Sequence, residues 1–309
     1  MTDFARDVRE ALLMQPQREL PSQYFYDAIG SALFEAITLL AEYGLTRADE
    51  RLLEKHAPEI IRAMTHPMVV VELGSGSGRK TRWILDAEAR REPHYFAIDV
   101  SAEALHQCAN ELGGVARVET IEDTYLSGLG RVARRRRAGD SMLVLFLGST
   151  IGNFHRPAAI EFLRGIRAHL RKGDALLLGT DLVKPASVLI PAYDDPAGIT
   201  AAFNLNLLAR INRELGADFV LRSFAHEVRY NRSHHRMEMH LQSLVDQTVT
   251  IPAAATAITL REGETIWTEA SYKYHPADVD EMARLAGFDR GVQFVDREWP
   301  FAETLLRVN

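Results

Sequence analysis

The sequence predicts an α/β fold: a parallel sheet carries an inserted portion made of a long helix and antiparallel strands. Three observations support this. An apolar run leads into a glycine-rich turn at residues 74–78, strands and helices then alternate to about residue 182, and from residue 226 the apolar period changes to two. Alternating strands and helices indicate a parallel sheet covered on both faces, whereas a two-residue period with short turns indicates antiparallel strands.

The glycine-rich turn is the most informative local feature. It follows Met68–Leu73, an apolar run typical of a buried strand. Its glycines let the backbone turn sharply and approach a ligand with no Cβ in the way. The next predicted strand, His94–Val100, carries Asp99 near its end, where a carboxylate can accept both hydroxyls of a ribose. Turn and acid together predict a nucleoside-cofactor site.

The spacing within the turn separates two cofactor families. Dinucleotide-binding folds use G-x-G-x-x-G, but this chain has G-S-G-S-G, with Glu72 two positions before the first glycine. The form E-x-G-x-G-x-G is similar to the first motif of class I methyltransferases, which bind S-adenosylmethionine (SAM). No P-loop sequence is present. We therefore expect a SAM-dependent methyltransferase sheet, with a nicotinamide dehydrogenase as the disfavoured alternative.

Composition limits the number of domains and the classes of protein to which the chain can belong. The 309 residues are 47% hydrophobic, enough for one large or two medium domains. A net charge of −6 gives no basis for binding nucleic acid. Cys108 is the only cysteine, and the charged amino terminus does not resemble a signal peptide, so we expect a cytoplasmic protein without membrane contact. The one basic run, Arg134–Arg137, is interpreted as a solvated helix end or loop.

The elements are expected in the following order. Helices precede the core at Asp3–Met14, from Gly30 to about Thr38, from an N-cap at Thr46 to about Lys55, and from Pro58 onward. The core has strands at 68–73, 94–99, 115–121, 141–147 and 174–182, and helices at about 79–90, 102–112 and 157–170. A helix at 198–215, strands within 226–274, a helix at 276–287 and strands at 292–295 and 304–308 follow. The expected domains are a core of 57–184 completed by 273–309, and a substrate-binding insertion of 185–272 packed with 1–56.

Longer motifs make the chain resemble one methyltransferase family. In order they are YFYDAIGSALFEAIT, EYGLTR, VELGSGSGRKT, FLGSTIGN, LLLGTDLVK, AYDDPAGITAAFNLNLLARINREL and TEASYKY. They resemble the histidine Nα-methyltransferases of ergothioneine biosynthesis, from about Leu20 to Tyr274. The resemblance implies a monomeric SAM-dependent enzyme that trimethylates the α-amino group of L-histidine, through mono- and dimethyl intermediates, to hercynine.

The resemblance also implies a site. The residues expected around SAM are Glu72, Gly74, Ser75, Gly76, Lys80, Asp99, Asp123 and Gly148. Those expected around the amino acid are Tyr43, Asn153, Tyr193, Met239, Glu269 and Ser271. In that set Asn153 and Tyr193 hold the carboxylate and amine, Glu269 and Ser271 bind the imidazole, and Met239 is a pocket wall. Tyr26 and Tyr43 are expected near the amine, where a phenol can help to remove its proton.

Methyl transfer requires positioning more than reactive side chains. A neutral amine must be held close to an activated methyl group, so no covalent nucleophile or metal is expected, and the histidines show no metal-site spacing. Glu269 and Ser271 are two apart in a predicted strand and so point to one face, where they can meet both imidazole nitrogens. From the pattern alone, a solvent-facing polar strand is the simpler interpretation, and the resemblance favours the pocket. Core packing of the tyrosines and an Asx turn at Asn153 remain alternatives.

The chain also departs from the family. Gly44 replaces an aromatic residue beside Tyr43, and Glu122-Asp123-Thr124 stands where the family has Gly-Asp-Phe. The first departure leaves open a second hypothesis, betaine formation on another amino acid such as tryptophan or tyrosine. A third, a non-catalytic module that binds SAM or an amino acid, is disfavoured because the candidate substrate residues are all present.

Overall fold

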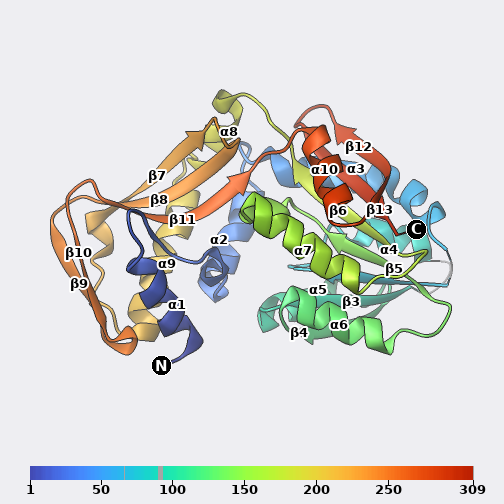
Figure 1. Ribbon diagram of the computed structural model, residues 1–309, viewed down its shortest axis with the longest axis horizontal. Helices are drawn as coiled ribbons and strands as arrows, with labels where there is room; N and C mark the ends of the chain where they lie inside the picture. Colours follow the sequence, from blue (N-terminus) through green and yellow to red (C-terminus); the bar gives the residue numbers. More distant parts are fainter. Residues whose placement is uncertain (66, 90–92, 309) are drawn as a thin grey trace. The chain divides into compact units, whose positions relative to one another are not determined.

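Figure 1 shows a computed structural model of the chain, which describes residues 1–65, 67–89 and 93–308. The chain forms two compact units. The insertion unit consists of Met1–Gly44 and Lys184–Ser271, and the core unit of Leu45–Val183 and Tyr272–Asn309. Residues 45–56, which the sequence analysis grouped with the amino-terminal segment, belong to the core unit in this division.

The core unit is built on a seven-stranded sheet in the order β12-β13-β6-β5-β2-β3-β4. Its strands are β2 Met68–Leu73, β3 His94–Asp99, β4 Arg117–Glu122, β5 Ser141–Phe146, β6 Ala175–Asp181, β12 Asp289–Asp296 and β13 Phe301–Arg307. The strands from β6 to β4 are parallel, and β13 runs antiparallel between β6 and β12. Every residue of β2, β5 and β6 is buried, as expected where helices cover both faces.

The order of the strands places the helices and the ligand edge. The helices are α3 Gly44–Arg62, α4 Arg82–Glu88, α5 Ala102–Leu112, α6 Tyr125–Arg135, α7 Arg156–Ala168 and α10 Pro276–Leu285. The chain moves outward from β2 through β3 to β4 and then returns to β5 and β6. Because parallel crossovers are right-handed, this reversal puts the connecting helices on opposite faces. The carboxyl ends of β2 and β5 flank the reversal, where such sheets bind ligands.

The insertion unit holds a four-stranded sheet, β1-β11-β8-β7, and a two-stranded ribbon, β10-β9. Its strands are β1 Arg18–Glu19, β7 Phe224–Asn231, β8 Arg236–Ser243, β9 Gln247–Ile251, β10 Thr256–Leu260 and β11 Thr265–Tyr272. Its helices are α1 Asp3–Leu12, α2 Ala28–Thr38, α8 Ala186–Tyr193 and α9 Ile199–Leu215, with a short η1 at Ser22–Phe25. The helices α8 and α9 pack on β7 and β8, and α2 packs along α9.

The predicted fold class is confirmed: a class I methyltransferase sheet carries a separate, largely antiparallel sheet. The N-cap expected at Thr46 and the helix break expected between Lys55 and Pro58 are wrong, because α3 runs unbroken from Gly44 to Arg62. Buried Leu45, Leu52 and Ile60 follow one apolar stripe across the proline, and this burial offsets the hydrogen bond that Pro58 cannot donate.

Two smaller expectations also change. The helix expected at about 79–90 is shorter, since α4 spans Arg82–Glu88, and residue 90 lies outside the described residues. The interpretation of Arg134–Arg137 as solvated is wrong for Arg136, whose side chain is 5% exposed and pairs with buried Asp174 at 2.5 Å. Within the described residues, no helix has the length and apolar character needed to cross a membrane.

Candidate active site

The turn after β2 has a backbone conformation that favours glycine. Gly74, Gly76 and Gly78 have φ angles of 77°, 50° and 74°. A Cβ on Gly78 would lie 2.7 Å from Sγ of Cys108, whereas a Cβ on Gly76 would meet nothing within 4 Å. Gly78 is therefore required by close packing under the turn, while the backbone at Gly76 borders open space that a ligand can approach.

Asp99, at the end of β3, ties this turn to the next helix. Its Oδ2 accepts a hydrogen bond from Gly76 N at 3.2 Å, and its Oδ1 accepts one from Ser101 N at 2.9 Å. Burial raises the pKa of the Asp99 carboxyl, and these two bonds oppose that shift. A carboxylate has about four acceptor positions. Asp99 can therefore hold the turn and still accept from the hydroxyls of a ribose.

Glu72 supports the turn from below. Its Oε2 accepts hydrogen bonds from Thr81 Oγ1 at 2.6 Å and from the Tyr95 hydroxyl at 2.5 Å. The side chain is buried, and burial raises the pKa of its carboxyl to about 7. Ser75, the neighbour of Gly74 in the turn, is also buried. In this structure Glu72 thus fixes the turn to α4 and β3, whereas the sequence analysis placed it around the cofactor.

A buried charged cluster lies at Lys80, a residue expected around SAM. Lys80 Nζ pairs with the Asp49 carboxylate, which also accepts a hydrogen bond from Gly148 N at 3.0 Å. Glu303 on β13 is fully buried, and burial together with the neighbouring Asp49 raises the pKa of its carboxyl well above the usual range. Neither carboxyl oxygen of Glu303 has a hydrogen-bond partner among the described residues, and burial therefore favours its protonated form. Neither acid was among the expected site residues, although Asp49 lies on the buried stripe of α3.

The remaining cofactor candidates lie around α6. Asp123 Oδ2 accepts from Ser127 Oγ at 3.0 Å and from Arg131 Nη1 at 3.2 Å, and these partners lower the pKa of its carboxyl. Tyr125 was not foreseen, yet a Cβ on Gly74 would lie 3.3 Å from its ring, and burial raises the pKa of its phenol to about 12. Its sequence signal was an aromatic residue directly after the unusual segment 122–124.

In the insertion unit, three predicted substrate residues come together. The Tyr193 hydroxyl, at the end of α8, donates to Ser271 Oγ on β11 at 2.8 Å. The Tyr43 ring packs edge-on against the Tyr193 ring with centroids 6.3 Å apart. All three side chains are buried. Tyr26 lies elsewhere in this unit, with its ring against Phe34 and Phe203 at centroid distances of 5.6 and 5.9 Å.

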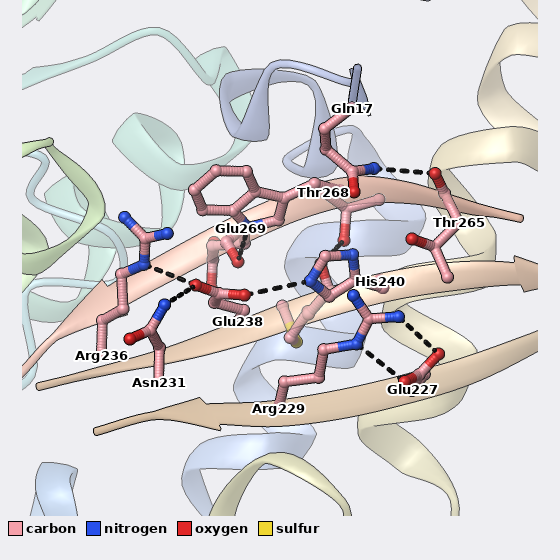
Figure 2. A network of polar contacts seen from close by, with 12 residues as sticks. Gln17, Glu227, Arg229, Asn231, Arg236, Glu238, His240, Thr265, Thr268 and Glu269 are labelled. Carbon is pink, nitrogen blue, oxygen red and sulfur yellow. Dashed lines mark hydrogen bonds and ion pairs between the residues drawn. The ribbon is translucent and has the colours of Figure 1, made fainter. Parts of the chain in front are cut away.

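Glu269 lies beside a polar network on β8 and β11 (Figure 2). The indole Nε1 of Trp267 donates to the carbonyl of Glu269 at 2.8 Å. The Trp267 ring has the Arg236 guanidinium 4.5 Å from its centroid and the His240 ring stacked at 6.1 Å. Glu238 links these two groups, accepting from Arg236 Nε at 2.6 Å and lying 3.3 Å from His240 Nε2. The backbone at Glu269 is therefore fixed by an anchored indole.

The last two candidates occupy different surroundings. Met239 is buried on β8, between Glu238 and His240, so strand alternation puts its side chain on the opposite face of that strand. Asn153 ends the short helix η3 Thr150–Asn153 of the core unit, whereas the other substrate candidates belong to the insertion unit. No cluster of three or more histidine, cysteine or acidic side chains suited to a metal ion occurs among the described residues.

Comparison with known proteins decides the family. Residues 4–308 match the family described as histidine-specific methyltransferase, SAM-dependent. The chain belongs to this family. It is 41% identical over 286 residues to a histidine N-alpha-methyltransferase of Mycolicibacterium smegmatis, covering 91% of this chain and 87% of that protein. It is 39% identical over 306 residues to a histidine N-alpha-methyltransferase of Mycobacterium tuberculosis, covering 97% of this chain and 93% of that protein.

A more distant relative bears on substrate choice. An L-tryptophan methyltransferase of Psilocybe serbica is 26% identical over 334 residues, covering 98% of this chain and 92% of that protein. Members of the histidine-specific family use SAM as the methyl donor. The residues of the core unit have the chemistry to hold SAM. Gly76 leaves room for close approach, Asp99 offers acceptors at a strand end, and Lys80 supplies a fixed positive charge.

Proposed function

We propose that this family member transfers methyl groups from SAM to the α-nitrogen of L-histidine, through the mono- and dimethyl intermediates, to give hercynine for ergothioneine biosynthesis. The observation that supports this substrate is the contact between Tyr193 and Ser271, with Glu269 two residues away on β11. A hydroxyl and a carboxylate at this spacing suit the two ring nitrogens of an imidazole.

The protein has two tasks in this reaction: to position SAM and the amino acid, and to remove a proton from the α-amine. Bound SAM supplies a methyl group that its sulfonium already activates. The glycine turn and Asp99 hold the nucleoside, and Lys80, kept in place by Asp49, offers its charge to an anionic group. Asn153 and Tyr193 are proposed to bind the α-carboxylate and α-amine.

The amine must lose its proton before each transfer. Tyr43 and Tyr26 are proposed to accept a hydrogen bond from the ammonium and pass its proton to water. Tyr43 is the better placed of the two for this role, because its ring packs on Tyr193, while the Tyr26 ring packs on phenylalanines.

The competing substrate is an amino acid with another aromatic side chain, and the similarity to an L-tryptophan methyltransferase is the reason to consider it. Glu269 argues for histidine. A phenyl ring offers that carboxylate no N–H, and leaving a carboxylate without a partner costs a few kcal/mol. An indole ring offers one N–H but no second ring nitrogen for Ser271.

Mass spectrometry tests the proposed function. The purified protein is incubated with SAM and a mixture of amino acids, and gains of one, two and three methyl groups are sought. Fragmentation should place all methyl groups of the histidine product on the α-nitrogen. Methylation of the ring, or of another amino acid in preference, would overturn the assignment, and no transfer at all would favour a binding module.

We further propose that the enzyme acts as a monomer in the cytoplasm. The proposal rests on the family resemblance and on the single, buried Cys108, whose burial raises the pKa of its thiol to about 11. Light scattering coupled to size-exclusion chromatography tests the monomer directly.

A further inference from the structure

Asn204, on α9, is a fully buried amide that the roles above do not use. Its Nδ2 lies 3.0 Å from the carbonyl oxygen of His240 and 2.8 Å from Nδ1 of His226. Its Oδ1 lies 2.7 Å from the hydroxyl of Thr268. One helical side chain therefore contacts β7, β8 and β11, the strands that carry or adjoin the candidate substrate residues.

The donors and acceptors around Asn204 determine the protonation of His226. A carbonyl oxygen only accepts, so the atom that faces the carbonyl of His240 is the amide nitrogen. The same nitrogen donates to His226 Nδ1, which therefore carries no proton. His226 Nε2 lies 2.8 Å from the carbonyl of Tyr193, which also only accepts. The network assigns His226 as a neutral imidazole with its proton on Nε2.

His226 thereby reaches the end of α8. This helix ends at Tyr193, and the carbonyls of a last helical turn have no partner within the helix. The phenol of Tyr193 then donates to Ser271. The contacts form a closed path that leaves β11 at Thr268, passes through Asn204, His226 and Tyr193, and returns to β11 at Ser271.

We propose that Asn204 and His226 are positioning residues of the amino-acid site, which hold the backbone of Tyr193 so that its phenol meets β11. Neither residue touches the substrate. The proposal rests on the proposed function in that Tyr193 and Ser271 bind the amino acid. Tyr193 and Asn204 lie near the two ends of the segment AYDDPAGITAAFN, so both ends of this segment serve one arrangement.

The first test reads the tautomer and needs no substrate. The protein is labelled with ring-¹⁵N histidine, and the His226 signals are identified by their loss in His226→Gln. Long-range proton–nitrogen correlations should show a neutral ring with its proton on Nε2, and this signature should change in Asn204→Ala. A proton on Nδ1, or a spectrum that Asn204→Ala leaves unaltered, would overturn the proposal.

The second test separates substrate binding from stability. Asn206→Ala is the matched control, because Asn206 is buried on the same helix but donates to Asp27 Oδ1 at 2.8 Å, away from Tyr193. Asn204→Ala should raise the KM for histidine about tenfold with a much smaller effect on kcat, and leave S-adenosylhomocysteine affinity unchanged. Asn206→Ala should leave that KM unchanged. Equal effects of the two variants on KM would refute a positioning role.

His226 offers a pair of variants for the case in which Asn204→Ala does not fold. His226→Gln keeps an N–H that can reach the Tyr193 carbonyl, and its KM should stay within about twofold of the parent. His226→Leu removes that donor and should raise KM about tenfold. A KM unchanged in His226→Leu would overturn the proposal. If the enzyme prefers another amino acid, the same comparison is made with that substrate, and the tautomer test stands independently.

Discussion

The hydroxyl of Tyr193 donates a hydrogen bond of 2.8 Å to Ser271, a residue 78 positions further along the chain. These two side chains were expected at different ends of the substrate, Tyr193 at the α-carboxylate and α-amine and Ser271 at the imidazole. The bond joins the two parts of the proposed site. A displacement of α8 at Tyr193 would therefore break or lengthen the hydrogen bond to Ser271 on β11.

The first prediction follows from this shared bond. Tyr193→Phe and Ser271→Ala should each lower kcat/KM for histidine, by about tenfold, because each removes a buried hydrogen bond. The double variant should lose much less than the product of the two effects, since both single changes remove the same contact. Steady-state kinetics of the four proteins checks this. Independent, multiplicative losses would mean that the two residues act separately.

Glu269 carries the second prediction, which concerns substrate choice. Glu269→Ala should lower kcat/KM for histidine by roughly 30- to 150-fold, the loss of a charge-assisted hydrogen bond worth about 2–3 kcal/mol. The same change removes the penalty against apolar rings, so tryptophan and phenylalanine should gain relative to histidine. Competition between amino acids, read by mass spectrometry, measures the ratio.

Glu269→Gln serves as the control for that prediction, because it keeps the size and polarity of the side chain but not its charge. The kcat/KM of Glu269→Gln for histidine should lie between that of the parent and that of Glu269→Ala. S-adenosylhomocysteine affinity should be the same in all three proteins. A Glu269→Ala variant that methylates histidine as fast as the parent contradicts the pocket assignment, while the SAM-dependent fold stands.

The third prediction distinguishes the two buried acids near Lys80. Asp49→Asn removes the charge that holds the Lys80 ammonium, and should weaken S-adenosylhomocysteine binding about tenfold. Glu303→Gln should change that affinity by less than about twofold, because glutamine resembles the protonated carboxyl that burial favours at this position. Isothermal titration calorimetry measures both. Similar losses in the two variants would show that Glu303 is charged in the native protein.

Much of the core unit could be predicted because its signals are local. The apolar run Met68–Leu73, the glycines after it and Asp99 lie close together in the sequence and fold into one strand–turn–strand arrangement. The helix expected at 102–112 is α5, and its cap is also local, because Ser101 accepts from Ala104 N at 3.2 Å. Local polarity and period suffice for such features.

The features that were missed depend on partners far away in the chain. Asp49 was not expected at the site, because its partners Lys80 and Gly148 lie far from it in the sequence. Asn204 likewise looked like one polar residue on a helix, because its role appears only when three strands pack against it. No periodicity in a single sequence reports such contacts.

The last prediction concerns pH and stability, and it follows from the buried carboxyl of Glu72. Burial raises the pKa of that carboxyl to about 7 in the folded protein, above its ordinary value of 4.5. The folded state therefore binds the proton more tightly than the unfolded state does. The stabilisation is fully present below the ordinary pKa and is lost as pH rises toward and through the folded pKa. The whole effect amounts to about 3 kcal/mol.

Glu72→Gln removes this titration while keeping an acceptor for Thr81 and Tyr95. At about pH 4 the variant and the parent should have similar free energies of unfolding, since Glu72 is then protonated in the folded parent and mostly protonated in the unfolded one. At about pH 8 the buried carboxyl of Glu72 is ionised in the folded parent, which destabilises it, so the variant should be the more stable of the two. Urea unfolding at both pH values measures the difference, in which groups shared by the two proteins cancel. Parallel stability curves would show that Glu72 is ionised in the fold throughout, held by its two hydroxyl donors.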